Sequence, residues 1–298
     1  MSESNAQNTI EEVIAPRISE WRHFYRVFLS RGLVIFGMVV ILIMIITAIF
    51  APFIAPYDPY ELGTGKILEQ PSWDHPLGTD QLGRDTLSRV IYGTQTSLMV
   101  GLIVVIAAGI VGMTLGLLAG YYTGWINMVI MRIIDALMCF PMILLALVIA
   151  SLLGGGIRNV ILALSVGLVP IYARLMCGQV LSVKNNDYVM AEKAIGASNQ
   201  RIMLKHIVMN CFPPLIVMMT MVLGATILAE AGLSFLGIGI EQPTPAWGSM
   251  VNDGRIYLVE SPILSFAPGV AIMLVVFAFN MVGDGLRDAL DPRLRGVI

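Results

Sequence analysis

The 298-residue chain is 57% hydrophobic and 13% charged, with a formal net charge of −2 and a mean hydropathy of +0.81. This composition excludes an ordinary soluble domain and indicates a polytopic membrane protein that has the lipid bilayer as its solvent. The nearly balanced charge gives no indication of a nucleic-acid partner, and we expect none.

The N-terminal segment 1–31 is polar at first and then basic, with Arg22, Arg26 and Arg31 ahead of an apolar run. A cleaved signal peptide is the alternative interpretation. However, the apolar run is longer than a typical signal-peptide core, and no clear small-residue cleavage site follows it. We therefore expect a tail with a basic amphipathic stretch, followed by an uncleaved anchor helix.

Six apolar segments are long enough to cross a membrane, because a hydrocarbon core about 30 Å thick needs about 20 residues of helix. They are residues 33–51, 98–120, 136–156, 159–183, 207–229 and 261–282, and Arg174 is the only charged residue in them. The sequence thus predicts an all-α polytopic membrane protein with six transmembrane helices.

The Lys and Arg residues are distributed unevenly between the loops that these six segments define. With the N-terminus inside, about 12 lie on the cytoplasmic side and about 5 outside, so the positive-inside rule places both termini in the cytoplasm. The organisation that follows is a cytoplasmic tail (1–31), a first helix with an external loop (32–97), a five-helix core (98–286) and a second cytoplasmic tail (287–298).

Small and charged residues within the core bear on helix packing. Gly112, Gly116 and Gly120 recur every four residues, which lets another helix approach closely, either in this chain or in a partner. Arg132 and Asp135 are three residues apart, and we expect them to pair on one helix face. Beyond these, Glu230 marks the external end of the fifth segment, and no segment centre carries the acidic or histidine chain of a proton relay.

Motifs for catalysis are missing from the chain. It has no GxxxxGK[ST] phosphate-binding loop, HExxH helix or nucleophile elbow, and its three His and three Cys residues are scattered. We expect no catalytic residue, no metal site and no cofactor bound by this chain.

The polar stretch 185–210 stands out between two apolar segments. Its pattern predicts a short helix from Tyr188, a left-handed turn at Gly196, and a second short helix that Ser198 caps and that runs toward His206. This would expose Glu192, Lys193, Arg201 and Lys205 to water and gather Tyr188, Ala191 and Ile195 on an apolar face. Such a projection suits a groove on a soluble partner, and a polar connector on the membrane surface is the alternative.

This stretch resembles the EAA loop of ABC importer permeases, in which Glu-Ala-Ala is followed three residues later by Gly and, further on, by an Ile-x-Leu-Pro run. Ala191, Gly196 and Ala197 match that loop. Met190 stands in place of the Glu, Glu192 in place of the second Ala, and Met209 in place of a Pro. Glu192 is a candidate substitute for the missing charge, but two residues along a helix turn by about 200° toward another face.

Three further stretches resemble the C-type permeases of the dipeptide, oligopeptide and nickel importers. They are residues 76–89, 233–248 and 283–292, and the resemblance covers about 32–295 in order. The first two supply candidates for the external surface and gate: Asp80, Gly83, Arg84, Asp85, Phe235, Gly237, Pro245 and Trp247.

The resemblance implies a permease subunit with the type I ABC importer fold in a bacterial or archaeal cytoplasmic membrane. It implies a homologous second permease, in a heterodimer, two ATPase subunits that use ATP and Mg, and an extracytoplasmic solute-binding protein. The residues implied to couple to the ATPase lie within 184–206: Tyr188, Ala191, Glu192, Gly196, Ala197, Ser198 and Arg201. A di- or oligopeptide is the expected solute, with nickel or another small solute as the alternative. A self-sufficient secondary transporter or channel is the alternative from another class.

Overall fold

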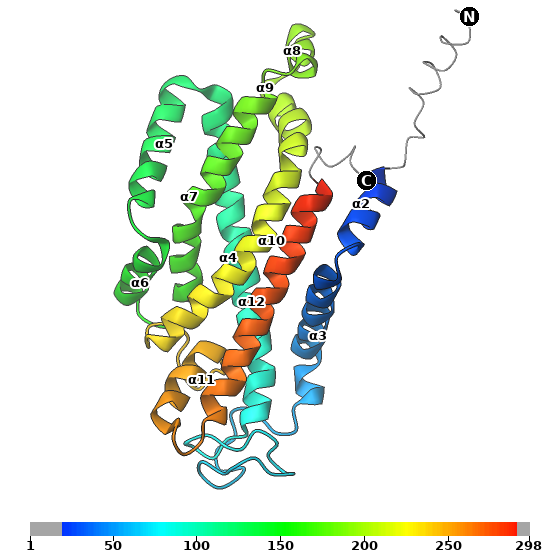
Figure 1. The fold of residues 1–298 in the computed structure, drawn as a ribbon. Coiled ribbons are helices and arrows are strands. Elements are labelled where there is room, and N and C mark those ends of the chain that lie inside the picture. Colours follow the sequence, from blue (N-terminus) through cyan, green and yellow to red (C-terminus); the bar gives the residue numbers. More distant parts are fainter. Residues whose placement is uncertain (1–19, 291–298) are drawn as a thin grey trace, which may run out of the picture.

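The computed structural model describes residues 20–290, and this part is built from helices (Figure 1). In chain order they are α2 (Glu20–Leu29), α3 (Gly32–Ile54), α4 (Thr86–Tyr122), α5 (Gly124–Met138), α6 (Met142–Leu153), α7 (Ile157–Val183), α8 (Asp187–Ala194), α9 (Asn199–Arg201), α10 (Val208–Phe235), α11 (Trp247–Gly254) and α12 (Ile263–Leu290). A π-helical segment, Ile202–Ile207, joins α9 to α10, and a 3₁₀ turn, Arg255–Tyr257, follows α11. Of the predicted tails, residues 1–19 and 291–298 lie outside the described residues.

Five of the predicted spans correspond to long, apolar helices. They are α3, α4, α7, the continuous helix Asn199–Phe235 and α12. Each has the length and the apolar composition that a membrane crossing needs. The predicted helical class and these five spans are therefore confirmed.

The third predicted span, 136–156, is not one straight helix. The apolar helices α5 and α6 meet at an angle of 88°, with a break at residues 139–141. Pro141 explains the break, because proline removes a backbone donor and disfavours helical geometry in the residue before it. The helical part also begins earlier than expected, at Gly124.

The broken pair nevertheless carries the chain across the molecule. Gly112 lies beside Tyr172 and Gly120 beside Val180, so α4 and α7 run in the same direction. The chain between them must therefore return from one end of the molecule to the other, and α5 and α6 make this return (Figure 1). Counted as one crossing, the pair brings the number of spans to six.

The glycine seam, Gly112, Gly116 and Gly120, holds α4 against α7 within the chain. A Cβ added at Gly112 would lie 2.7 Å from the Val169 carbonyl oxygen, and one at Gly116 would collide with the Ala173 carbonyl. Backbone atoms cannot move aside as a flexible side chain can. Of the two possibilities left open by the sequence, packing within the chain is the correct one.

Asp135 pairs with Arg174 rather than with Arg132. The Arg174 guanidinium donates to Asp135 Oδ1, which joins α5 to α7. The expected local pair with Arg132 is therefore wrong, because packing of α5 against α7 gives the carboxylate a partner on the neighbouring helix.

The first membrane helix, α3, lies at the periphery. It packs on α12, where Gly37 lies against Ala278 and Val34 lies against Gly285. Arg31 pairs with Asp288 at 2.8 Å. Only Val34, Gly37 and Ala51 are buried in α3, so most of its apolar surface is free to face lipid.

Replacing Gly116 with alanine tests the glycine seam. The added Cβ must push α7 away, and overpacking of this kind costs about 1–3 kcal/mol. We expect the G116A protein in detergent to unfold at a lower temperature than the wild type. The matched control is G109A on the same helix, where the new Cβ would meet only the flexible side chains of Met219 at 3.5 Å and Met113 at 3.8 Å. Equal unfolding midpoints for the two variants would contradict the seam.

Candidate functional site

Loop 184–206 projects beyond the ends of α7 and α10 (Figure 1). Its helix α8 has Asp187 in the first turn and Lys193 in the last, and both charges favour the helix dipole. Gly196 follows with a φ of +82°, and a Cβ there would meet nothing within 4 Å. The left-handed turn is present as predicted, and the backbone conformation alone, rather than crowding, favours glycine.

Ser198 caps the next helix by accepting a hydrogen bond from the Arg201 backbone N–H at 3.4 Å. The cap is as predicted, but the short second helix is not. The chain passes from α9 through the π-helical segment into α10, so that residues 199–235 form one continuous helix. Ile202, Met203 and Ile207 are buried in a cluster with Leu215, which makes the first turns part of the core. Loop 184–206 is thus attached to α10 without a flexible link.

The expected apolar face of α8 is present and uncovered in the described chain. Tyr188, Ala191 and Ile195 are exposed, as is Met190 at the position of the missing Glu. Val189, on the opposite side, is fully buried against the core. Val189 was not among the residues predicted to matter, although an apolar residue one position from an exposed one indicates a second, inward face.

Glu192 does not face water as expected. Its Oε1 lies 3.4 Å from His206 Nε2, and each of these side chains is about one-fifth exposed. Met190 points outward while Glu192 turns toward the start of α10, as their 200° separation on a helix requires. Glu192 is therefore poorly placed to replace an outward charge contact. Lys193, Arg201 and Lys205 are exposed as predicted.

The opposite end of the molecule holds a buried charged cluster of Asp80, Arg84 and Arg89. Asp80 accepts hydrogen bonds from the backbone N–H groups of Leu82 at 2.8 Å and Arg84 at 3.0 Å. It also accepts from Arg84 Nε at 2.6 Å, and Arg89 Nε lies 3.6 Å from the same carboxylate. Paired and hydrogen-bonded in this way, the three charges are stable away from water.

Arg89 joins three segments of the chain. Its Nη1 donates to the carbonyl oxygens of Pro59 at 2.9 Å and Pro243 at 3.3 Å. Arg84 reaches Gln242 Oε1 at 3.2 Å. The loop after α3, the start of α4 and the loop after α10 are therefore held together by two guanidinium groups.

Two further candidates for the external surface and gate are buried anchors. Asp85 caps α4 by accepting from the Ser88 N–H at 2.7 Å, and it lies 2.9 Å from His75 Nδ1. Trp247 is fully buried and donates to the Val90 carbonyl at 3.0 Å, with its ring packed against Gly93.

The eight candidates for the external surface and gate differ in their exposure. Phe235 and Gly237 are exposed, whereas the other six are buried: Asp80, Gly83, Arg84, Asp85, Pro245 and Trp247. Gly83, for example, has a φ of +70°, and a Cβ there would lie 2.8 Å from the Gly65 carbonyl. These six residues shape the two loops from within.

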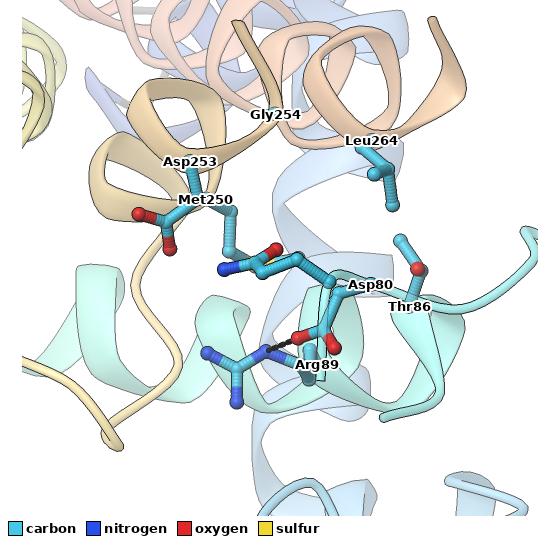
Figure 2. Close-up of a pocket in the computed structure, with 8 residues that line it drawn as sticks. Asp80, Thr86, Arg89, Met250, Asp253, Gly254 and Leu264 are labelled. Atoms are coloured by element: carbon cyan, nitrogen blue, oxygen red, sulfur yellow. Dashed lines mark ion pairs between the residues drawn. The ribbon is translucent and has the colours of Figure 1, made fainter. Parts of the chain in front are cut away.

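The cavity beside this cluster is too small to hold a solute. Figure 2 shows Asp80 and Arg89 on one side of it and Asp253 and Met250, from α11, on the other. Its volume of about 10 Å³ leaves room for at most one water molecule. Burial raises the pKa of the Asp253 carboxyl above its ordinary value, against the opposing effects of a Gln242 hydrogen bond and of Arg89 and Arg84.

Glu230, expected to mark the end of the fifth segment, is fully buried there. It accepts hydrogen bonds from Ser234 Oγ at 2.8 Å and Ser97 Oγ at 3.5 Å, and Ser234 Oγ accepts from the Ile240 N–H at 3.0 Å. The carboxylate thus fixes the turn after α10 to α4. A lone acidic residue at the end of an uncharged apolar segment was the only signal of this role.

Comparisons with known proteins agree with this architecture. The family profile described as "Binding-protein-dependent transport system inner membrane component" matches residues 112–296. A second, "N-terminal TM domain of oligopeptide transport permease C", matches residues 19–71. Together they cover the central and C-terminal helices and the N-terminal helix.

Relatives and solved structures fit the same family. The chain is 43% identical to the dipeptide transport system permease protein DppC of Alkalihalophilus pseudofirmus over 93% of this chain and 91% of the relative. It is 41% identical to the glutathione transport system permease protein GsiD of Pectobacterium atrosepticum over 92% of each. The inward-facing MetNI methionine ABC transporter has a similar fold, with a TM-score of 0.56 and 17% identity over 69% of this chain and 98% of that one.

The matches are to transport permeases rather than to enzymes, and they place the protein among the multi-pass permeases of the inner membrane. Its relatives work in ABC importers, which in general depend on ATPase and binding-protein subunits. The chain therefore belongs to the binding-protein-dependent transport system inner membrane components and is a C-type permease of an ABC importer.

Proposed function

We propose that this permease forms half of a solute pathway and passes the movement of ATPase subunits to it through loop 184–206. One observation carries the proposal. An exposed apolar face on α8 is joined, without a flexible link, to a continuous helix that crosses the membrane. Movement of α8 by a partner would therefore tilt α10 as a lever.

The orientation that we propose places α8 and both termini in the cytoplasm. The start of α2 and the end of α12 lie at the same end of the molecule as α8, and the loop between α3 and α4, which contains Asp80 and Arg84, lies at the other (Figure 1). This arrangement agrees with the excess of Lys and Arg in the loops on the α8 side. Phe235, the last residue of α10, and Gly237, in the loop after it, would then face the solute-binding protein.

We further propose a heterodimer with a homologous second permease and two ATPase subunits, which bind and hydrolyse ATP with Mg. A groove of about 440 Å³, lined mainly by apolar residues of α7, α10 and α12, gives one face for the pathway. Its lining includes Pro213 and Pro214, where missing backbone donors favour a bend in α10. Half a pathway of this kind is closed only by a second permease.

A short peptide is the solute that we propose. The relatives above are named for dipeptides and for glutathione, itself a small peptide. Selectivity would rest largely with the binding protein, so the direct test is to purify the cognate binding protein and identify its bound molecule by mass spectrometry. We expect di- or oligopeptides, and a nickel complex or an unrelated solute would refute this assignment.

Gly196 provides a test of the coupling role. A β-branched residue there is strained by the left-handed backbone, at a cost of about 1–3 kcal/mol, yet its Cβ meets no neighbouring atom within 4 Å. We expect Gly196→Val to lower solute uptake while ATP hydrolysis by the assembled transporter continues. Gly178→Val is the control, because Gly178 has an ordinary helical backbone and equally open space. Unchanged uptake in Gly196→Val would contradict the coupling role.

The apolar face of α8 can be tested by co-purification. Ile195 is 78% exposed, and Ile195→Asp would place a charge where an apolar groove on the ATPase is expected. We expect the amount of ATPase that co-purifies with the permease to fall about tenfold or more. Asn185→Asp adds the same charge on the exposed loop outside this face and should leave the amount of co-purified ATPase unchanged. A secondary transporter or channel predicts no ATPase in either preparation, and uptake that survives without one.

A further inference from the structure

The last turn of α4 contacts loop 184–206 through Tyr121. The Tyr121 hydroxyl donates a hydrogen bond to Asn199 Oδ1 at 2.7 Å, across 78 residues of sequence. The Lys193 ammonium lies 5.7 Å from the centre of the same ring, within the range of a cation–π contact. One side chain of α4 therefore touches both the end of α8 and the start of α9.

A second contact fastens the same helix end. Lys184, which follows α7, donates from Nζ to the Gly120 carbonyl oxygen at 2.9 Å. Carbonyls in the last turn of a helix lack intrahelical donors, and a cation there is favoured by the helix dipole. The lysine thus holds the two parallel helices together just before the loop begins.

Apolar packing lies beneath these polar contacts. Leu117 of α4, Val180 of α7, Val189 of α8 and Ile202 at the start of the α10 helix belong to one cluster, and Tyr121 packs against it. A close-packed cluster resists deformation, so its members are expected to move together.

We propose that Tyr121 is the positioning residue through which loop 184–206 moves α4. This inference rests on the coupling role proposed above and adds a second helix that the loop moves. The first helix is α10, which continues directly from the loop. The second is α4, which is joined to the loop by side-chain contacts alone. We call the contact of Tyr121 with Asn199 and Lys193 the Tyr121 joint. In it, the hydroxyl makes a directional hydrogen bond and the ring packs against the loop.

The other end of α4 determines what a movement passed on through Tyr121 would reach. The helix has 37 residues, and at 1.5 Å per residue it is about 55 Å long. Its first turns carry Arg89, which binds the Pro59 and Pro243 carbonyls, and the Val90 carbonyl, which accepts from Trp247. Movement of α8 would therefore reach the loops at the opposite membrane face through one helix.

The test uses the complete transporter in proteoliposomes with its cognate binding protein. Uptake of radiolabelled dialanine and ATP hydrolysis are measured together, and their ratio gives the solute moved per ATP. The ratio of ATPase activity with and without the binding protein is a second readout that needs no choice of solute. A merely structural defect lowers the amount of assembled transporter and leaves both ratios unchanged.

Tyr121→Phe removes the hydroxyl and keeps the ring, and Asn199→Leu removes the acceptor. We expect each to lower the solute moved per ATP by about fivefold, the effect of one lost hydrogen bond. The double variant should lower it no further, because both changes break the same contact. Asn199→Asp keeps an acceptor and should preserve the ratio. Tyr122→Phe is the matched control, because Tyr122 is exposed and adjacent.

Unchanged ratios in both Tyr121→Phe and Asn199→Leu would overturn the joint. Gly196→Val separates this failure from failure of the coupling role itself. If Gly196→Val uncouples the transporter while the Tyr121 and Asn199 variants do not, the loop acts through α10 alone. If none of these three variants alters uptake per ATP, both the coupling role of the loop and the role of Tyr121 are refuted.

Discussion

Close packing of α4 against α7 is the interaction on which the rest of the structure depends. Lipid supplies no hydrophobic force between membrane helices, so contact between backbones at small residues has to hold them. The seam at Gly112, Gly116 and Gly120 does this for two helices that run in the same direction. The chain must then return between them, which the bent pair α5 and α6 accomplishes, and loop 184–206 begins at the end of a paired unit.

The two ends of this unit differ in chemistry. At one end, loop 184–206 leaves an apolar face of α8 exposed and joins the core through Val189 and the continuous helix 199–235. At the other, the charged cluster and Trp247 bind the long loops to α4 from within. An exposed face suits a partner that docks and releases, whereas buried and paired charges suit loops that keep one shape while the helices move. This difference is what the proposed transmission of motion requires.

Local signals in the sequence predicted local features well. The turn at Gly196 and the cap at Ser198 depend on their own backbone, and five spans followed from uninterrupted apolar runs. The sequence could not separate Pro141, where the helix breaks, from Pro170, Pro213, Pro214 and Pro268, which all lie inside helices, so proline alone does not mark a break. The partner of Asp135 and the burial of Arg84 and Trp247 depend on tertiary packing. A motif identifies residues that matter, but it does not show whether their side chains are exposed or buried.

The most direct test of the account is whether α4 and loop 184–206 move as one unit. Spin labels at Leu102→Cys and Gln200→Cys, both exposed, in a chain whose three native cysteines are replaced by serine, would report their separation. Leu102 lies about 28 Å along α4 from Tyr121, which suits pulsed electron resonance. The account predicts the same distance in the complete transporter with and without bound ATP. A change of several ångströms on ATP binding would contradict it.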